Sequence, residues 1–162
     1  MPRARLHFVF QKQFFTLLQK EFSEIPWLRE EIIASGETYA LVKDTELIGG
    51  ITIFEHAPKT PEILKEAEGR LNGRPAVFAS CFVIAEEYKK KGYGLFLAKE
   101  VLEKEVFTKG NVAWGVFQKH ELADFYKKHF NCEIYPLPPN LNLIIFTSMS
   151  STTKTKNIGS RA

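Results

Sequence analysis

Cysteine and metal-binding patterns are scarce in this chain of 162 residues. Only Cys81 and Cys132 are present, without a C-x-x-C pair and without a histidine at metal-ligand spacing. We therefore expect no metal, and we expect both thiols to be buried. A direct part for Cys81 in a reaction is the alternative.

Long apolar runs are absent as well. No run approaches the ~20 residues that a membrane-spanning helix needs. The start, Met1-Pro2-Arg3-Ala4-Arg5, lacks the apolar segment of a signal peptide. The sequence therefore predicts a cytoplasmic protein without a membrane partner. Hydrophobic residues make up 44% of the chain and charged residues 25%, which is typical of a soluble globular domain.

The body of the chain also lacks an excess of basic residues. The net charge of +3 matches Lys154, Lys156 and Arg161, which lie in an acid-free stretch at residues 148–162. Without them, 19 basic residues balance 19 acidic ones. A nucleic-acid binder usually carries a basic face across its fold, so nucleic acid is not an expected partner. We predict one domain over residues 1–147 and a polar basic tail over residues 148–162.

Apolar periodicity predicts strands that alternate with helices. The predicted strands are residues 5–10, 37–43, 46–54, 76–84, 112–117, 132–135 and 141–147. The predicted helices are residues 13–22, a segment between Ser23 and Gly36, and residues 61–71, 94–107 and 121–129. Gly49-Gly50, inside a predicted strand, indicates a bulge or a close approach of two backbones.

The most informative stretch joins the strand 76–84 to the helix 94–107. The strand is apolar and rich in β-branched and aromatic residues, as a buried central strand is. A polar loop with Gly92 and Gly94 then leads into a helix start. Such a junction leaves backbone N–H groups unpaired and adds a helix dipole, so it suits an anion. Glycines there let a phosphate approach the backbone closely.

Two common phosphate loops do not fit this stretch. The pattern G-x-x-x-x-G-K-[ST] is absent, and G-x-G-x-x-G fails because Leu97 stands at the third glycine. The segment Lys89-Lys90-Lys91-Gly92-Tyr93-Gly94 instead resembles the acyl-CoA pyrophosphate loop of the GNAT N-acetyltransferase superfamily, Arg/Gln-x-x-Gly-x-Gly/Ala. Lys89 replaces the usual Arg or Gln, which keeps a cation but loses the planar fork. Residues 123–130 are similar to the family's A-x-x-F-Y-x-K-x-G-F segment, without its Gly-Phe.

The resemblance covers residues 5–147 and implies the GNAT fold. This is an α/β (α+β) fold with a mixed, mostly antiparallel central sheet flanked by helices. The helix predicted at residues 61–71 is an insertion between the third and fourth strands, where the family often has a simple hairpin. This helix either shapes a binding cleft or packs on a partner, or it only covers the core.

The resemblance further implies an acetyl-CoA-dependent N-acetyltransferase. The enzyme would move an acetyl group directly to a primary amine of a small molecule or protein within a ternary complex. Acetyl-CoA would be the cosubstrate, with its pantetheine arm along one strand and its pyrophosphate on the following loop. The implied cosubstrate-binding residues are Phe82, Val83, Ile84, Lys89, Lys90, Lys91, Gly92, Tyr93, Gly94 and Leu95.

Tyr126 is the implied general acid, because a phenol within reach can protonate the departing CoA thiolate. The general base stays open: Glu55, His56 and His120 follow predicted strands, but a structural role is the favoured explanation of each, and none is assigned to catalysis. The amine acceptor and the choice between monomer and homodimer also stay open. Because the segment around Tyr126 departs from the family pattern, a non-catalytic GNAT-shaped module that binds acyl-CoA or a partner is the alternative function.

Overall fold

The computed structural model describes residues 3–5, 8–21, 30–118 and 121–150. The chain divides into two compact units, one with residues 1–58 and 78–101, the other with residues 59–77 and 102–162. Within the described residues, no helix is long and apolar enough to cross a membrane.

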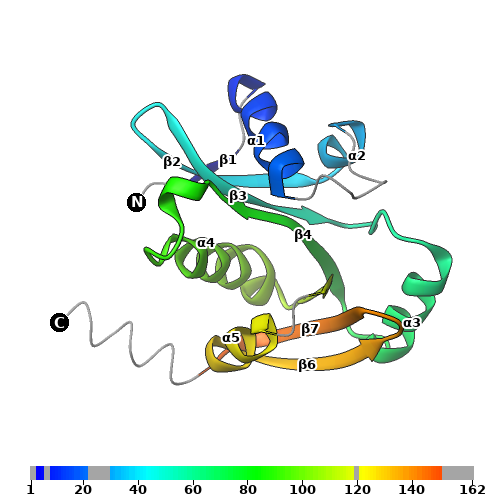
Figure 1. Ribbon diagram of the computed structural model, residues 1–162. Coiled ribbons are helices and arrows are strands. Elements are labelled where there is room, and N and C mark those ends of the chain that lie inside the picture. Colours follow the sequence, from blue (N-terminus) through cyan, green and yellow to red (C-terminus); the bar gives the residue numbers. More distant parts are fainter. Residues whose placement is uncertain (1–2, 6–7, 22–29, 119–120, 151–162) are drawn as a thin grey trace. The chain divides into compact units, whose positions relative to one another are not determined.

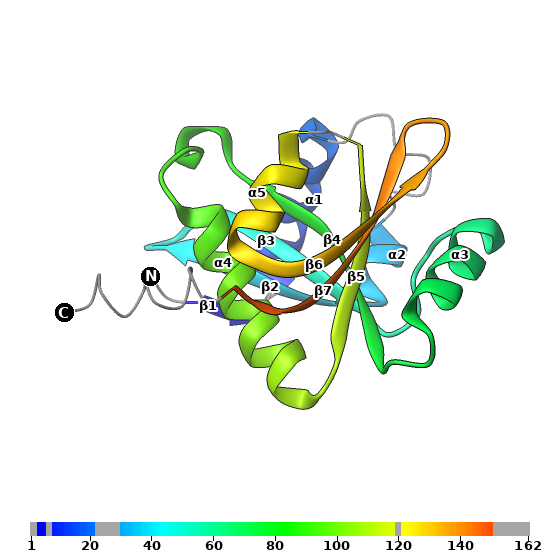
Figure 2. The same cartoon turned by 90° about the horizontal axis from the view of Figure 1, so that it is seen from below.

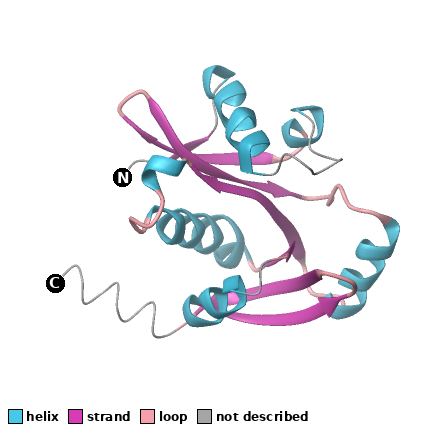
Figure 3. Ribbon diagram, viewed as in Figure 1, coloured by secondary structure: helices cyan, strands magenta, loops and turns pink. Residues whose placement is uncertain are grey.

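The first unit is built on an antiparallel arrangement of strands in the order β1-β2-β3-β4. These strands are β1 (Arg3–Arg5), β2 (Glu37–Lys43), β3 (Glu46–Phe54) and β4 (Ala76–Ile84). The helices α1 (Phe8–Glu21) and α2 (Glu30–Ala34) cover one face, and α4 (Tyr93–Val101) covers the other (Figure 1). A short 3-10 turn, η1 (Glu86–Tyr88), and a loop connect β4 to α4 (Figure 3).

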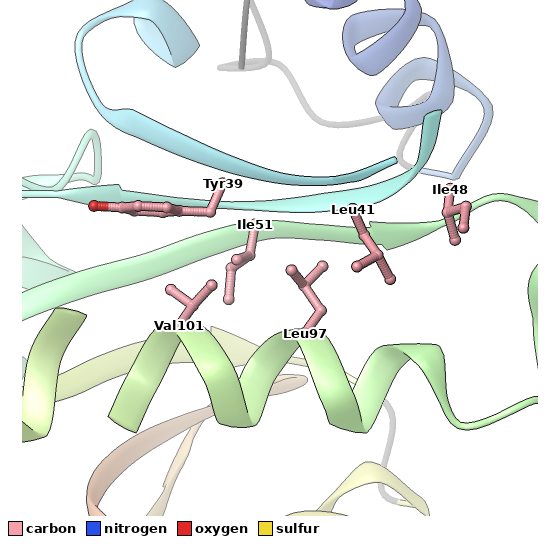
Figure 4. Close-up of a cluster of buried hydrophobic side chains, with 6 residues drawn as sticks. All are labelled: Tyr39, Leu41, Ile48, Ile51, Leu97 and Val101. Atoms are coloured by element: carbon pink, nitrogen blue, oxygen red, sulfur yellow. The ribbon is translucent and has the colours of Figure 1, made fainter. Parts of the chain in front are cut away.

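A hydrophobic cluster fixes α4 against the sheet of the first unit. Leu41 of β2 and Ile51 of β3 point toward Leu97 and Val101 of α4, and the Tyr39 ring lies along the strands (Figure 4). Together with Ile48 these residues form one buried cluster. On the opposite face, Phe14 and Leu18 of α1 are buried as well. Burial on both faces explains why β3 is a nearly continuous apolar run.

The second unit contains the antiparallel strands β5, β7 and β6 in that order (Figure 2). Its strands and helices are α3 (Pro61–Leu71), a π-helical turn η2 (Leu102–Val106), a 3-10 turn η3 (Phe107–Lys109), β5 (Val112–Phe117), α5 (Glu121–His129), β6 (Phe130–Leu137) and β7 (Leu141–Met149). Aromatic contacts hold α5, since the Tyr126 ring lies 5.3 Å from the Phe146 ring of β7.

The inserted helix α3 is tied to β6 inside the second unit. Arg74, just after α3, donates two hydrogen bonds to the carboxylate of Glu133, at 2.8 and 3.0 Å. The Tyr135 hydroxyl donates to the same carboxylate at 2.8 Å, and the Arg70 guanidinium lies 4.3 Å from the Tyr135 ring centroid. Arg74 also holds the pKa of Glu133 below its ordinary value through this hydrogen bond. A planar, bidentate pair of this kind fixes the end of α3 in orientation as well as in distance.

Most predicted bounds are confirmed, but the first strand is wrong. The strands at 37–43, 46–54, 76–84 and 112–117 and the helices at 61–71 and 121–129 begin and end as predicted. The strand predicted at 5–10 ends at Arg5, and α1 begins at Phe8. The short run Phe8-Val9-Phe10 has strand-like composition, yet it also continues the apolar spacing of the helix, and periodicity alone does not separate the two.

The predicted end of the last strand at residue 147 is also wrong. The strand β7 continues to Met149, which is 3% exposed and pairs with Phe130, while Ser148 pairs with Asn131. Ser148 and Met149 therefore belong to the sheet, because β6 starts at Phe130 rather than at the predicted Cys132 and gives β7 a longer partner. Residues 151–162 and the first part of the second predicted helix lie outside the described residues.

Candidate functional site

A bulge in β4 includes the first of the strand residues that the sequence singled out, Phe82. Gly50 pairs with Val83 and Thr52 pairs with Ser80, so Cys81 and Phe82 both lie opposite the single residue Ile51. Cys81 has a left-handed backbone, with φ 55°, and is 6% exposed. Such a conformation in a residue other than glycine costs about 1–3 kcal/mol and needs support from its surroundings. The bulge bends β4 at this point and re-aims the residues that follow.

Gly49 lets β3 approach β4 closely at the end of this segment. A Cβ atom on Gly49 would lie 2.3 Å from the carbonyl oxygen of Val83 and 2.7 Å from Cδ1 of Ile84. The close approach predicted for Gly49-Gly50 is therefore confirmed. Val83 is buried, whereas Phe82 and Ile84 are half-buried and pack against the cluster of Figure 4. Because these side chains pack toward the core, a ligand along this segment would contact mainly main-chain groups.

The loop after β4 turns through two left-handed residues. Lys90 has φ 62° and Gly92 has φ 87°, and α4 begins at the next residue, Tyr93. The amide of Phe96 donates to the carbonyl of Gly92 at 3.1 Å, which closes the first turn of the helix. The amides of Tyr93, Gly94 and Leu95 precede that bond and have no intrahelical acceptor. These donors, at the positive end of a helix dipole, form an arrangement that binds anions.

The two loop glycines differ in what they require. Gly92 needs its lack of a side chain for its φ value, although no atom lies within 4 Å of the position that a Cβ atom would take. Gly94 has an ordinary backbone, and its Cβ would lie 3.5 Å from Cζ of Phe82, which is a normal contact distance. Alanine would therefore fit at residue 94, in line with the Gly/Ala alternation of the pattern quoted above.

The three lysines of the loop, residues 89–91, do not converge on a common partner. Lys89 Nζ lies 3.0 Å from Glu86 Oε2, and Lys91 Nζ lies 5.9 Å from the centroid of the Tyr88 ring. Lys90 and Lys91 are exposed. The predicted positive charge is present at the loop, but Glu86 partly neutralises the cation that stands where the family pattern has Arg or Gln.

Tyr126 lies on α5 in an aromatic environment of the second unit. Its ring centroid is 5.4 Å from that of Phe117 and 5.8 Å from that of Phe125. Burial raises the pKa of Tyr126 to about 12. No hydrogen bond to its hydroxyl is found within the described part of the chain. Tyr126 therefore stays protonated over the whole physiological range. Its catalytic role stays a prediction.

The groups considered as a general base gain no support. Glu55 and His56 are exposed after the end of β3. His120 lies outside the described residues. Among the residues that are described, no cluster of three histidine, cysteine or acidic side chains could hold a metal ion. Sequence reasoning missed the bulge at Cys81 and the hydrogen bond from the Tyr88 hydroxyl to Glu46.

Comparison with known proteins gives matches in structure only. No family model and no curated protein matches the sequence. An aminoglycoside 6'-N-acetyltransferase complexed with coenzyme A superposes with a TM-score of 0.64 at 15% identity, over 90% of this chain and 95% of that one. A GNAT family acetyltransferase from Elizabethkingia anophelis with acetyl-CoA bound gives 0.62 at 13% identity, over 91% and 97%. The chain has the GNAT fold.

A third solved structure broadens the comparison. FeeM, an N-acyl amino acid synthase from uncultured soil microbes, has a TM-score of 0.66 at 12% identity and covers 95% of this chain and 97% of its own. The fold predicted from the loop at residues 89–94 and from the order of elements is thus confirmed. At these identities the likeness establishes the GNAT fold, while the activity has to be argued from the residues of this chain.

Proposed function

We propose that this chain is an acetyl-CoA-dependent N-acetyltransferase that moves an acetyl group to a primary amine of a small molecule or protein. The observation that carries the proposal is the junction of β4 and α4 within a GNAT fold. There, the left-handed Gly92 and the first-turn amides of α4 form an anion site directly after the bulged strand. Such a site suits the diphosphate of a ligand, and the adjacent strand suits a flexible arm attached to that diphosphate.

The diphosphate of CoA would lie on the amides from Lys91 to Leu95. A phosphate on these groups gains charge-assisted hydrogen bonds and the favourable end of the helix dipole. Lys90 and Lys91 are exposed and would add positive charge around it. Lys89 would contribute fully only after it leaves Glu86, an exposed ion pair that costs ~0–1 kcal/mol to break.

The pantetheine arm would follow the main chain of Phe82, Val83 and Ile84. The side chains of these residues pack inward or are half-buried, which leaves peptide groups as the natural partners of the pantetheine amides. A main-chain N–H of this segment would also donate to the thioester carbonyl oxygen, where negative charge develops as the amine attacks.

The reaction would proceed by direct attack of a neutral amine on the thioester carbonyl carbon. The new C–N bond forms, the C–S bond breaks, the amine loses one proton and the CoA thiolate gains one. An alkyl ammonium group has a pKa of ~10, so a base or a water chain must take its proton first. We assign no residue to that step.

Tyr126 would hold the departing thiolate. With a pKa of about 12, its proton does not transfer fully to a thiolate whose conjugate acid has a pKa of ~8.5. The phenol therefore acts first as a hydrogen-bond donor that stabilises the thiolate in the transition state, and the proton finally comes from solvent or from the amine. A hydrogen bond to a charged group contributes roughly 1.5–3 kcal/mol, which is enough for a sizeable effect on rate.

An acceptor screen tests the proposal. Purified protein is incubated with acetyl-CoA and a panel of amines, including polyamines, aminoglycosides, amino acids and lysine peptides, and free thiol and acetylated product are measured. Thiol release matched by acetyl-amine formation is the expected result. Tight CoA binding with no product from any amine would instead support the non-catalytic module, and no CoA binding at all would overturn the proposal. Longer acyl-CoAs, tested as donors in parallel, define the acyl group.

A further inference from the structure

Tyr88 is the centre of a contact network around the proposed diphosphate loop. Its hydroxyl donates to Glu46 Oε2 at 2.9 Å, across 42 residues of sequence. Its ring lies edge-on to Tyr93, the first residue of α4, with centroids 5.8 Å apart and an interplanar angle of 72°. The Lys91 ammonium lies over the same ring. One side chain thus connects the start of β3, the loop and the start of α4, all within the first unit.

The loop needs such support because its own conformation is unfavourable. Lys90 is left-handed without being glycine, which costs roughly 1–2 kcal/mol, and Gly92 follows two residues later in the same region. Strained residues of this kind persist where the surrounding structure holds them. Glu86, Glu87, Lys90, Lys91 and Gly92 are all exposed, so they give the loop little packing.

Two tyrosines link this exposed stretch to the interior of the unit. Tyr88 and Tyr93 are partly buried and pack against the core cluster of Tyr39, Leu41 and their neighbours. Tyr88 is only partly buried, so packing constrains its side chain less than it constrains a core residue. The hydrogen bond to Glu46 adds a further constraint, because Glu46 is the first residue of β3 and pairs with Lys43 in a tight hairpin.

The charge of Glu46 indicates that it acts on the loop through geometry. A carboxylate near a diphosphate site repels the ligand, so its charge does not help binding directly. Its oxygen, however, is an acceptor at a fixed point of the hairpin. The amide oxygen of a glutamine could accept the same hydrogen bond without the charge, so geometry and charge can be separated by experiment.

We propose that Glu46 and Tyr88 are positioning residues that hold the loop from Lys89 to Gly92 in the conformation that binds the CoA diphosphate. The inference rests on the proposed function, because it assumes that the loop receives this ligand. It adds a residue pair, from the β2–β3 hairpin and the loop, whose effect is confined to the diphosphate half of the cosubstrate.

The test compares three variants, Tyr88→Phe, Glu46→Ala and Glu46→Gln, in binding titrations. The ligands are CoA, its nucleotide half (adenosine 3'-phosphate 5'-diphosphate) and acetyl-pantetheine, which lacks the diphosphate. Tyr88→Phe and Glu46→Ala are expected to weaken CoA and the nucleotide half by about three- to tenfold, the loss of one hydrogen bond. Both variants should bind acetyl-pantetheine like the wild type, and Glu46→Gln should bind all three ligands within about twofold of the wild type.

A double variant and a matched control complete the design. Tyr88→Phe combined with Glu46→Ala should lose no more affinity than either change alone, because both remove the same bond. Tyr135→Phe is the control: it removes an equivalent phenol–carboxylate bond, to Glu133, in the second unit, and should leave CoA affinity unchanged. Melting temperatures of all variants show that each is folded.

The outcomes separate the inference from the proposed function. If the wild type does not bind CoA, the proposed function is wrong. If the wild type binds CoA and both Tyr88→Phe and Glu46→Ala bind it equally well, only the inference is overturned. The inference is also overturned if these variants weaken acetyl-pantetheine as much as CoA, since the pair would then act on the whole unit. If Glu46→Ala and Glu46→Gln lose the same CoA affinity, the effect comes from the charge of Glu46, and this result also overturns the inference.

Discussion

At the scale of single residues, three left-handed backbones shape the site. Cys81 marks the bulge in β4, and Lys90 and Gly92 turn the loop toward α4. Of these three, Gly92 alone is recognisable in the sequence, because glycine is the usual residue for this conformation. Cys81 and Lys90 adopt the left-handed conformation because the surrounding structure holds them there at a local cost. No local pattern in the sequence predicts this conformation at a cysteine or a lysine.

Tyr126 carries the first prediction at this scale. In Tyr126→Phe the ring and its contacts with Phe117 and Phe146 remain, so stability and acetyl-CoA affinity should change little. Loss of the hydroxyl should lower kcat by roughly 10- to 150-fold, the rate equivalent of a hydrogen bond of ~1.5–3 kcal/mol to the thiolate. The measurement is kcat and acetyl-CoA Kd on the same preparation, with any amine that the screen finds. A variant with the kcat of the wild type would remove Tyr126 from the mechanism.

The pH dependence follows from the same residue. Burial raises the pKa of Tyr126 to about 12, so its hydroxyl keeps its proton well above the ordinary tyrosine value of ~10. We expect kcat to rise as the amine loses its proton and to show no falling limb from Tyr126 below pH ~11. A falling limb near pH ~10 that disappears in Tyr126→Phe would contradict the raised pKa. By linkage, this group stabilises the fold fully below pH ~10 and loses that contribution as the pH rises through its folded pKa.

At the scale of elements, the sequence predicted buried strands and amphipathic helices well. The strand 76–84 and the helix 61–71 have the predicted bounds because apolar content and the flanking Pro and Asn-Gly signals agree. The strand prediction for Phe8-Val9-Phe10 is wrong because a short apolar segment fits both the two-residue period of a strand and the 3.6-residue period of a helix. The end of β7 was missed because Ser148 is polar, and its pairing depends on a partner strand whose own start was placed too late.

Gly49 gives the prediction that belongs to the elements. In Gly49→Ala the new methyl group would lie 2.3 Å from the Val83 carbonyl oxygen, so β3 and β4 must move apart. We expect the free energy of unfolding to fall by ~1–3 kcal/mol, the usual cost of overpacking. Gly69→Ala is the control, since no atom lies within 4 Å of its Cβ position in α3. That variant should gain ~0.5–1 kcal/mol from helix propensity. Equal stability of both variants in urea unfolding would disprove the close approach.

At the scale of the whole molecule, order of elements and one loop were enough to predict the GNAT fold. Hydrophobic patterning sets the order of helices and strands along the chain, and any sequence of this fold must keep that pattern. The order is therefore shared with structures at 12–15% sequence identity. The pair of Glu46 and Tyr88 could not be predicted, because it joins residues 42 positions apart through side chains that any surface could carry. The acceptor could not be predicted either, since no residue pattern in the chain specifies one amine.

The C-terminal end yields a prediction for the whole chain. Truncation after Thr147 removes Met149, which is 3% exposed, and the last two pairs between β6 and β7. Full burial of such a side chain contributes roughly 1.5–3 kcal/mol, so the melting temperature should drop by several degrees. Truncation after Ser150 leaves the strand intact and removes only the polar segment that the sequence predicts as a tail. Its melting temperature should equal that of the full chain, and an equal drop in both truncations would show that residues 151–162 are part of the folded domain.

The central claim, that the loop before α4 binds the CoA diphosphate, is tested most directly by titrating CoA into two glycine variants. Gly92→Val and Gly110→Val place the same side chain on left-handed glycines, φ 87° and φ 80°, that both have open space around the Cβ position. Of the two, Gly92 alone lies in the proposed site. The account predicts that Gly92→Val weakens CoA binding at least tenfold, about 1.4 kcal/mol, while Gly110→Val binds like the wild type. Equal CoA affinity in the wild type and a folded Gly92→Val protein would contradict the account.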